Sequence, residues 1–398
     1  MISVEEAFSR IVGDVKPLTT EKLPVAETSG RVLAAPLPAR RSQPGADMSA
    51  MDGYAVRNTD LGGKEPAALK RIGESAAGAP FTGKLGAGEA VRIFTGAIVP
   101  EGADQVVIQE NATEDKGTVY TREAPSPRAN IRGKGQDFLE RQVVLDAGTF
   151  LTPKSIGLAA SAGYAHLMVY RAPKIAILST GDELAAPDQK SFKAHETVNS
   201  TAPQLAALFK DAGAVVLPPM QAGDTLKDLK TAIAKTADAD ILVTIGGASV
   251  GEKDLIQQAL SESGMKLDFW KVAMRPGKPL IHGHMGDRHV LGLPGNPVSA
   301  FVCALLFVRP LIDALMGRPA PMPSGVMLPL AAGLPENGSR QHYMRAQLTG
   351  EPGSRHIAPA AEQDSSLLTV LAQSDGLIVR APDAPAAKAG DLVPFLPF

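Results

Sequence analysis

Glycines, hydroxyls and acids gather in four short stretches that each follow a strand-like run. The stretches are TGDEL after Ser179, MQAGD after Pro219, GGASVGEKD after Ile245 and PGNPVS after Leu293. Glycine lets the backbone approach a ligand closely, and a helix start offers unpaired N–H groups to an anion. Carboxylates beside a phosphate are typical ligands of Mg²⁺. The stretches together predict a site for a phosphate-bearing ligand, formed by Gly246, Gly247, Ser249, Gly295 and Asn296 and by the acids Asp182, Glu183, Asp224 and Asp254.

Each stretch also has a plainer interpretation that stays open at this point. PGNP is also typical of a tight turn in which Asn296 caps a helix and Pro297 takes its first position. Asp224 can be an ordinary N-cap, and Asp254 an acid that interacts with the helix dipole. One residue can have both roles.

Three cations lie close together in FWKVAMRPGKP, namely Lys271, Arg275 and Lys278. This spacing fits a clamp for a phosphate or an oxyanion, although a solvated surface strand would look similar. The turn residues Pro276 and Gly277 at their centre favour a shaped site.

Alternating strands and helices must position these residues. From Ala172 onward the sequence predicts strands at KIAILS, AVVLPP, DILVTI, FWKVAM, PLIHGH and VLGL, with helices over 202–213, 224–237, 254–264 and from Asn296 to Gly317. A helix that starts near Asn296 is expected to kink or restart at Pro310. Such alternation predicts a doubly wound, mostly parallel sheet covered on both faces. Ligands bind at the carboxyl edge of such a sheet, so the four stretches should meet there.

The remaining chain predicts smaller elements. Residues 3–15 read as an amphipathic helix with a capping box at Ser3 and Glu6. Thr152 and Pro153 predict a second helix start, with Gly163 as its end and HLMVYR as the strand that follows. Short β-like runs dominate residues 40–140, and residues 326–398 form a second small β region after the Pro-rich segment 318–325.

Composition restricts the class of protein. The 398 residues carry a net charge of −2, so no basic excess indicates a nucleic-acid partner or a membrane surface. The single cysteine fits a reducing compartment, and the N-terminus has no signal-peptide pattern. The longest apolar run has 12 residues, whereas a membrane span needs about 20. We therefore expect a cytoplasmic protein with no nucleic-acid and no membrane partner.

Three other residue types receive structural interpretations. His282 and His284 alternate on one strand face, and without a third ligand at matching spacing they are interpreted as an ordinary strand face. Cys303 lies in an apolar helix and is expected to be a buried structural thiol. Trp270 is interpreted as packing.

Several motifs in a fixed order resemble one family. They are SAMDGYAV, RIFTGAIVPEGADQVV, IRGKGQD, STGDEL, GGASVGEKD, RPGKP and LPGNPVSA. This order resembles the molybdopterin molybdenumtransferase family, which includes MoeA-like proteins and the C-terminal domain of gephyrin. The resemblance covers nearly the whole chain, and SAMDGYAV together with PGNPVS is specific.

The resemblance implies an architecture in four parts and a dimer. An elongated, partly helical domain would comprise 1–39 and 141–171, and a β-rich domain over 40–140 would be inserted into it. A doubly wound pterin-binding domain would follow over 172–318, and a C-terminal β domain over 326–398. Members act as homodimers, with an active site between the doubly wound domain of one subunit and the inserted domain of the other.

The resemblance also implies a reaction. Molybdate would be inserted into adenylylated molybdopterin with release of AMP, in the presence of Mg²⁺. A molybdopterin adenylyltransferase and molybdoenzymes would then be partners. The positions that match functional positions of the family are Asp52, Thr95, Arg132 and Asp137 in the insert, Glu183, Asp224, Asp254 and Lys271 in the pterin domain, and Arg345 in the last domain. Of these, Asp224 and Asp254 are the expected metal ligands, and Ser365 is a further match in the last domain.

The sequence departs from the family pattern in places. Arg275 stands where many relatives have Lys, and an Arg fork is not a Lys point charge. Two other hypotheses stay open. A pterin adenylyltransferase would use a similar domain with Mg-ATP, although the additional regions argue against it. A scaffold or anchoring module is disfavoured by the intact acidic and basic residues.

Overall fold

The computed structural model describes residues 1–63, 65–247, 255–351 and 353–398. The chain divides into two compact units. Unit 1 comprises Met1–Glu21, Gly30–Val32 and Tyr170–Phe398, and unit 2 comprises Lys22–Ser29 and Leu33–Val169. Boundaries between smaller domains inside each unit stay a prediction.

A mixed seven-stranded sheet organises unit 1. Its order is β16-β13-β18-β22-β21-β19, and β17 also pairs with β13. Strand β13 runs parallel to β16, β17 and β18, and β18 runs parallel to β22, whereas β21 is antiparallel to both of its neighbours. The parallel strands β13, β18 and β22 are buried along almost all of their length because helices cover both faces, whereas the short strands β16 and β17 are partly exposed. The bounds are β13 (Lys174–Thr180), β16 (Val215–Val216), β17 (Met220–Ala222), β18 (Ile241–Ile245), β19 (Lys266–Lys271), β21 (Pro279–Met285) and β22 (Arg288–Leu293).

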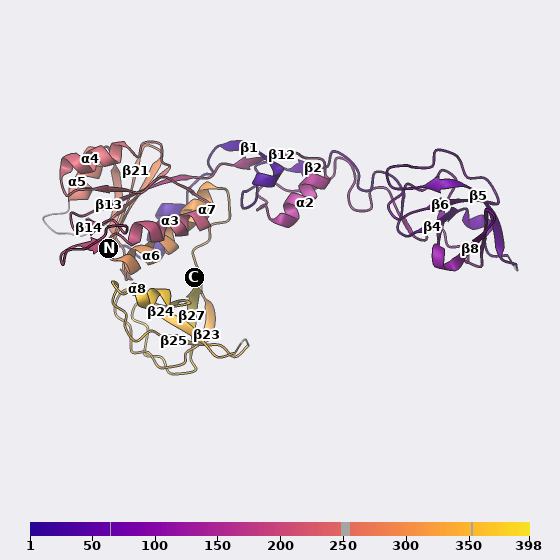
Figure 1. The fold of residues 1–398 in the computed structure, drawn as a ribbon. Helices are drawn as coiled ribbons and strands as arrows, with labels where there is room; N and C mark the ends of the chain where they lie inside the picture. Colours follow the sequence, from indigo (N-terminus) through magenta and orange to yellow (C-terminus); the bar gives the residue numbers. More distant parts are fainter. Residues whose placement is uncertain (64, 248–254, 352) are drawn as a thin grey trace. The chain divides into compact units, whose positions relative to one another are not determined.

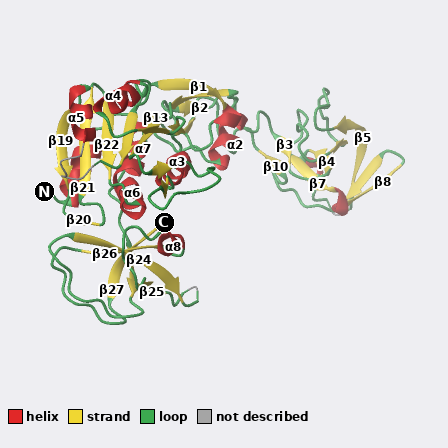
Figure 2. Cartoon of the chain, turned by 60° about the vertical axis from the view of Figure 1, so that its left-hand side comes forward, coloured by secondary structure: helices red, strands yellow, loops and turns green. Residues whose placement is uncertain are grey.

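Helices lie on both faces of this sheet (Figures 1 and 2), and each face packs into a separate hydrophobic cluster. Helices α4 and α5 cover one face, and α1, α3, α6 and α7 cover the other. Helix α1 shows why: its buried residues Val4, Ala7, Ile11 and Val12 recur at helical spacing, and Ser3 caps it by accepting the N–H of Glu6. The expected capping box forms only in this half, and Glu6 Oε1 accepts Arg10 Nη2 at 2.6 Å. The bounds are α1 (Val4–Val12), α3 (Thr201–Asp211), α4 (Leu226–Ala234), α5 (Leu255–Glu262), α6 (Pro297–Cys303) and α7 (Arg309–Leu315).

The helix after PGNP is continuous through Pro310. A π-helical segment, Ala304–Val308, joins α6 to α7 directly before that proline. Proline cannot donate an N–H to the preceding turn, so the widened turn absorbs the missing hydrogen bond. Pro297–Leu315 is long and apolar enough to cross a membrane by length and composition, yet 78% of its apolar window is buried. That burial is typical of a core helix.

A second sheet in unit 1 contains the C-terminal residues. Its order is β20-β24-β26-β27-β23, with β25 paired to β24. The edge strand β20 comes from the segment before Pro276 and pairs in parallel with β24, Arg275 opposite His342. The expectation of one strand over FWKVAM was therefore wrong, because the chain leaves the first sheet after Lys271 and joins the second. The bounds of this region are β20 (Met274–Arg275), β23 (Val326–Pro329), β24 (Gln341–Thr349), β25 (His356–Pro359), α8 (Leu368–Ala372), β26 (Gly376–Arg380) and β27 (Leu392–Pro397). Strands β14 (Leu184–Ala185) and β15 (Thr197–Val198) form a separate two-stranded pair.

Unit 2 is rich in β-structure. A six-stranded sheet has the order β7-β4-β6-β5-β9-β8. The strands that flank it in the sequence form two separate pairs, β10-β3 and β11-β2. Thr152 caps helix α2 in a capping box with Ser155, and Pro153 takes its first position, as the sequence predicts. The bounds are β2 (Leu37–Pro38), β3 (Met48–Ser49), β4 (Gly53–Val56), β5 (Ala67–Ser75), β6 (Glu89–Ile93), β7 (Gln105–Ile108), β8 (Ala112–Asp115), β9 (Thr118–Thr121), β10 (Ile131–Arg132), β11 (Val143–Leu145) and α2 (Pro153–Ser161). Strands β1 (Thr20–Pro24) and β12 (His166–Tyr170) span the boundaries between the units.

One strand of the first sheet is shorter than expected. The sequence predicts a strand over AVVLPP followed by a turn over MQAGD. Instead, β16 ends at Val216, and Met220–Ala222 form β17. Pro218 and Pro219 have no N–H to donate to the ladder, so the strand is interrupted there and resumes beyond them.

Candidate functional site

The turns that follow β13, β18 and β22 meet at the carboxyl edge of the sheet. Gly246 has a positive φ of 91°, and a Cβ on it would lie 2.9 Å from the Thr180 carbonyl oxygen, so only glycine fits this position. A Cβ on Gly295 would lie 3.6 Å from the Gly246 Cα. Three turns that spread over more than a hundred residues of the chain thus meet at Gly246, as the sequence predicts.

The turn after β17 joins the same edge through two acids. The backbone N–H of Asp182 donates to Asp224 Oδ2 at 3.3 Å, and the backbone N–H of Asp224 donates to Asp182 Oδ1 at 3.2 Å. This reciprocal pair leaves one oxygen of each exposed carboxylate for another partner. The alternative that Asp224 caps α4 was wrong, because Thr225 is the N-cap and accepts the N–H of Asp228.

A cavity of about 820 Å³ opens where the turns meet. Glu183 and Asp224 supply its acids, and Gly246, Gly247 and Gly295 supply backbone. The loop before α3 contributes polar groups that the sequence analysis did not select, namely Thr197, Asn199 and Ser200. The signal was present in TVNS, a polar stretch directly before a helix. The volume lies within the range of small-molecule sites.

PGNPVS connects this edge to the C-terminal sheet region. Asn296 takes the N-cap position of α6 and Pro297 its first position, but the Asn296 side chain makes no capping hydrogen bond. Its amide Nδ2 instead donates to Ser365 Oγ at 2.9 Å, and the Val298 N–H donates to the Ser365 carbonyl at 3.2 Å. The capping interpretation is therefore correct for position and wrong for the side chain.

A second, cationic cavity of about 290 Å³ adjoins the first. Pro279 lines both cavities, and the consecutive residues Ser366 and Ser365 line the first and the second respectively. The positively charged lining residues are Arg275, Lys278, Arg340 and Arg345, with Asp364 as the acid among them. Burial, followed by the charges of Arg275, Arg340, Arg345 and Arg380, lowers the pKa of His342 to about 4. The cavity therefore has a positive potential that suits an anion.

Arg340 and His342 were not selected from the sequence. Arg340 directly precedes β24 and His342 is its second residue, and their alternate positions in RQHYMR were the available signal. Arg345 was selected as a substrate residue, but it is only 2% exposed. Its guanidinium donates to the carbonyls of Leu367 and Glu362, both at 3.2 Å. Arg345 therefore holds the 362–367 loop that carries Ser365.

Lys271 is not among the described lining residues of either cavity, although its backbone pairs with Pro279, which lines both. Its ammonium group sits 3.9 Å from the centroid of the Trp270 ring, a cation–π contact at the edge strand β19. Trp270, which was interpreted as packing, is 36% exposed, and its ring is the partner of the Lys271 ammonium group. Cys303 is fully buried, as expected, and burial raises the pKa of its thiol to about 12.

In unit 2, the sequence-selected Asp52 and Thr95 are in direct contact. The Thr95 backbone N–H donates to Asp52 Oδ1 at 2.7 Å, and the Thr95 hydroxyl donates to the same oxygen at 2.8 Å. These two hydrogen bonds lower the pKa of the Asp52 carboxyl group. Both go to Oδ1, so neither occupies Oδ2.

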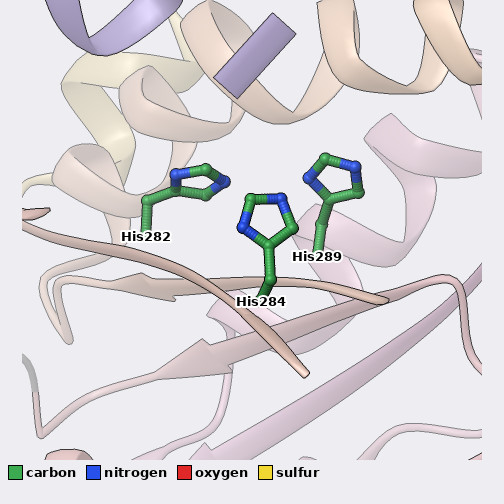
Figure 3. A group of neighbouring side chains, drawn as sticks. All are labelled: His282, His284 and His289. Carbon is green, nitrogen blue, oxygen red and sulfur yellow. The ribbon is translucent and has the colours of Figure 1, made fainter. Parts of the chain in front are cut away.

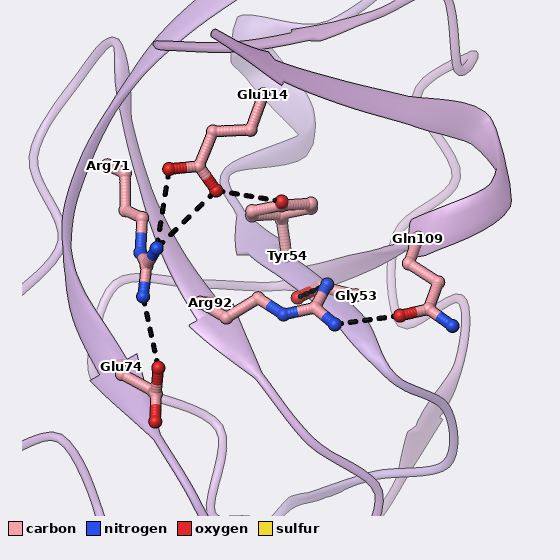
Figure 4. Close-up of polar contacts among 7 residues, drawn as sticks. All are labelled: Gly53, Tyr54, Arg71, Glu74, Arg92, Gln109 and Glu114. Atoms are coloured by element: carbon pink, nitrogen blue, oxygen red, sulfur yellow. Dashed lines mark hydrogen bonds and ion pairs between the residues drawn. The ribbon is translucent and has the colours of Figure 1, made fainter. Parts of the chain in front are cut away.

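A polar network holds the strand that follows Asp52 (Figure 4). Arg92 donates to the Gly53 carbonyl at 3.3 Å and to Gln109 Oε1 at 2.7 Å, and its guanidinium lies 5.0 Å from the Tyr54 ring centroid. The Tyr54 hydroxyl donates to Glu114, which also pairs with Arg71. The MDGYA motif is thus fixed by both backbone and side-chain contacts.

Arg132 and Asp137 lie on a segment whose backbone pairs with the residues that precede Asp52. Strand β10 pairs with β3, with Arg132 opposite Met48, and the Asp137 N–H donates to the Gln43 carbonyl at 2.9 Å. Both side chains are exposed. The remaining selected residues, Ser249 and Asp254, lie outside the described residues.

Comparisons with known proteins match this architecture along the chain. Residues 2–163 match the MoeA N-terminal region (domain I and II), residues 176–314 a probable molybdopterin binding domain, and residues 327–398 the MoeA C-terminal region (domain IV). A molybdopterin molybdenumtransferase of Haemophilus influenzae is 35% identical over 100% of this chain and 99% of its own length. One from a Nostoc species is 36% identical over 90% of this chain and 84% of its own length.

Solved structures agree with the sequence comparisons. The crystal structure of a molybdopterin biosynthesis MoeA protein from Pyrococcus horikosii superimposes with a TM-score of 0.85 at 27% identity, covering 100% of this chain and 99% of the other. The fold and these matches define a multidomain α/β transferase of molybdenum cofactor biosynthesis. The chain belongs to the molybdopterin molybdenumtransferase family, and the resemblance seen in the sequence is confirmed.

Proposed function

We propose that this chain inserts molybdate into adenylylated molybdopterin and releases AMP in a reaction that depends on Mg²⁺. The observation that carries the proposal is the meeting of four turns around a cavity that contains Glu183 and Asp224 and adjoins a cationic cavity. An adenylylated pterin carries an anhydride with two phosphorus atoms, so it needs both anion-binding groups and a place for a hard cation.

The glycine turns would bind the pterin phosphate. The backbone at Gly246, Gly247 and Gly295 is close enough to the cavity for direct approach, and Ser249 would add a hydroxyl donor. Asn296 is already engaged with Ser365, so we assign it the positioning of the C-terminal loop at the cavity rim. This loop connects the two cavities.

The cations would neutralise the anhydride and the molybdate oxyanion. Arg275 and Lys278 line the second cavity, where the field of several guanidinium groups favours an anion. Charge stabilisation of this type is commonly the largest contribution to phosphoryl-group chemistry. Lys271 would contribute from the adjacent strand edge.

The acidic groups fit Mg²⁺ because they are hard oxygen donors. Asp224 lines the cavity with one carboxylate oxygen accepting a backbone N–H, and a Mg²⁺ ion is commonly held by one or two carboxylates together with substrate phosphates. We assign Asp224 and Asp254 as the ligands. When bound, the ion would neutralise phosphate charge in the anhydride. Glu183 would position a water molecule and accept one of its protons while the water oxygen bonds to the phosphorus of the pterin phosphate. The P–O bond of the anhydride breaks at the same time, and AMP leaves with the electrons of that bond.

The insert residues would complete the site in a homodimer. Asp52 with Thr95, Arg132 and Asp137 supply acidic, hydroxyl and basic groups on unit 2. We propose that these residues act on substrate held by unit 1 of the partner subunit. A cytoplasmic location and handover from an adenylyltransferase belong to the same proposal.

The test is release of AMP from adenylylated molybdopterin with Mg²⁺ and molybdate. Glu183→Gln and Asp137→Asn should abolish release, and Asp211→Asn, an exposed acid at the end of α3, should keep it. Release at the unsubstituted rate in both site variants would contradict the proposal. ATP consumption with non-adenylylated molybdopterin would show adenylyltransferase activity instead.

A further inference from the structure

Three histidines meet on one face of the first sheet, at its antiparallel strands (Figure 3). His282 and His284 belong to β21 and His289 to β22, where His284 and His289 are direct cross-strand partners. His282 lies two positions along on the same face, because side chains alternate along a strand. The third ligand that the strand pattern of the sequence lacks is therefore on the neighbouring strand.

The three imidazole rings pack against each other. The centroid distances are 4.9 Å for His282–His284, 4.6 Å for His284–His289 and 6.0 Å for His282–His289. His282 is fully buried and His289 is 9% exposed. Among the described residues, His282 Nε2 and His289 Nδ1 are buried nitrogens without a hydrogen-bond partner. Buried polar atoms without a partner are rare and call for an explanation.

A carboxylate orients one of the rings. His282 Nδ1 lies 3.1 Å from Asp268 Oδ2, and Asp268 Oδ1 accepts Arg10 Nη1 at 2.9 Å. A carboxylate oxygen only accepts, so Nδ1 carries the proton and Nε2 keeps its lone pair. A carboxylate behind the non-ligating nitrogen is the arrangement commonly found behind metal-binding histidines.

We propose that His282, His284 and His289 bind one Zn²⁺ ion. One nitrogen from each ring lies within 4.8 Å of those of the other two. Four-coordinate zinc with bonds of about 2.0–2.1 Å separates its ligand nitrogens by about 3.3 Å, so ring rotations that bring the nitrogens closer by up to about 1.5 Å would close the site. Three imidazoles leave a fourth position for water. Imidazole nitrogen without thiolate or carboxylate in the set suits zinc better than Mg²⁺ or Ca²⁺.

This site lies at the opposite end of β22 from the phosphate-binding edge. His289 is the second residue of β22, and the last residue of that strand, Leu293, leads into PGNP. The four residue steps from His289 to Leu293 span about 13 Å. The ion therefore takes no part in the chemistry at Glu183 and Asp224. The ion would link β21 to β22. His282 in turn bonds Asp268 on the edge strand β19, and Asp268 accepts a hydrogen bond from Arg10 on α1. Binding to the folded chain alone raises its stability.

Zinc titration of the chelator-stripped full chain tests this proposal. We expect one tightly bound Zn²⁺ per chain by competition with a chromogenic chelator, and a rise in Tm when zinc is added. His284→Gln is the main variant because this half-buried side chain can be replaced without opening the core, and His289→Gln is the second. Each should weaken binding at least tenfold and remove the rise in Tm.

The matched control is His195→Gln, an exposed histidine remote in sequence, which should bind zinc as the unsubstituted chain does. Co²⁺ in place of Zn²⁺ should give visible absorption bands typical of four-coordination, and these should vanish in His284→Gln. Absence of tight binding in the unsubstituted chain, or equal affinity in His284→Gln, would overturn the proposal. Neither result bears on AMP release, so the two proposals stand or fall separately.

Discussion

Replacing Arg345 by Met separates a structural role from a ligand-binding one. Methionine keeps the aliphatic packing of this buried side chain and removes its donors to the Leu367 and Glu362 carbonyls. Hydrogen bonds from a charged donor contribute about 1.5–3 kcal/mol each. The Glu362 residue is exposed and water can replace part of its bond, so the lower value applies. We expect a loss of about 3 kcal/mol in the free energy of unfolding of unit 1.

The assay has a global and a local readout. A loss of about 3 kcal/mol lowers Tm by about 6–12 °C in a unit of roughly 250 residues. Hydrogen–deuterium exchange should also become faster in the 362–367 loop, because the guanidinium of Arg345 holds both ends of that loop, with Gln363 bonded to the Arg345 backbone as a further anchor. The matched control is Arg275→Met, an exposed cation of the same cavity, which should change the free energy by less than about 0.5 kcal/mol.

The two variants should also differ in function. Arg275→Met should weaken anion binding and leave stability unchanged. Arg345→Met should weaken anion binding and also lower the free energy of unfolding. Unchanged Tm and unchanged loop exchange in Arg345→Met would refute this reasoning, since the guanidinium would then be available for a ligand.

Three further predictions concern packing and titration. Gly277→Ala should cost about 2–4 kcal/mol in chemical denaturation, because φ is +103° and the new Cβ would lie 2.5 Å from Cys303 Sγ; Gly286→Ala, with φ +62° and open space, should cost only about 1 kcal/mol. The buried Cys303 thiol, whose pKa is raised to about 12, should resist a maleimide at pH 8 in the native chain and react once denaturant is added; fast native labelling would contradict the packing. Burial lowers the pKa of His342 to about 4, that of His282 to about 4 and that of His289 to about 3, so these groups bind more protons when unfolded. Their contribution to the stability of the metal-free chain is therefore complete above pH 6.5 and is lost as pH falls toward 4, and His342→Gln should give a shallower decline in urea midpoints between those values.

Features that depend on local chemistry were predictable from the sequence. Apolar runs that end in glycine turns predicted the strand ends at the carboxyl edge, and the contacts of Gly246 with Thr180 and Gly295 confirm that these turns meet. Ser3 and Thr152 also cap their helices as predicted. In each case a short stretch determines the backbone, and the parallel sheet supplies the rest.

Features that depend on long-range pairing were not predictable. The partner of Arg275 is His342, 67 positions along the chain, and no local pattern shows that β20 leaves one sheet for another. His289 becomes the neighbour of His284 only through strand register. The choice between Asp224 and Thr225 as the cap is local but ambiguous, because both residue types are good N-caps.

The exchange of β20 between sheets has a consequence for shortening the chain. A product that ends before β23 would lack β24, and the Met274–Arg275 backbone would lose the only parallel neighbour that the described residues give it. An uncovered strand edge readily recruits another chain. Premature termination near residue 320 should therefore yield an aggregating fragment and not a smaller soluble enzyme, so the last fifth of the polypeptide acts as a folding requirement for what precedes it.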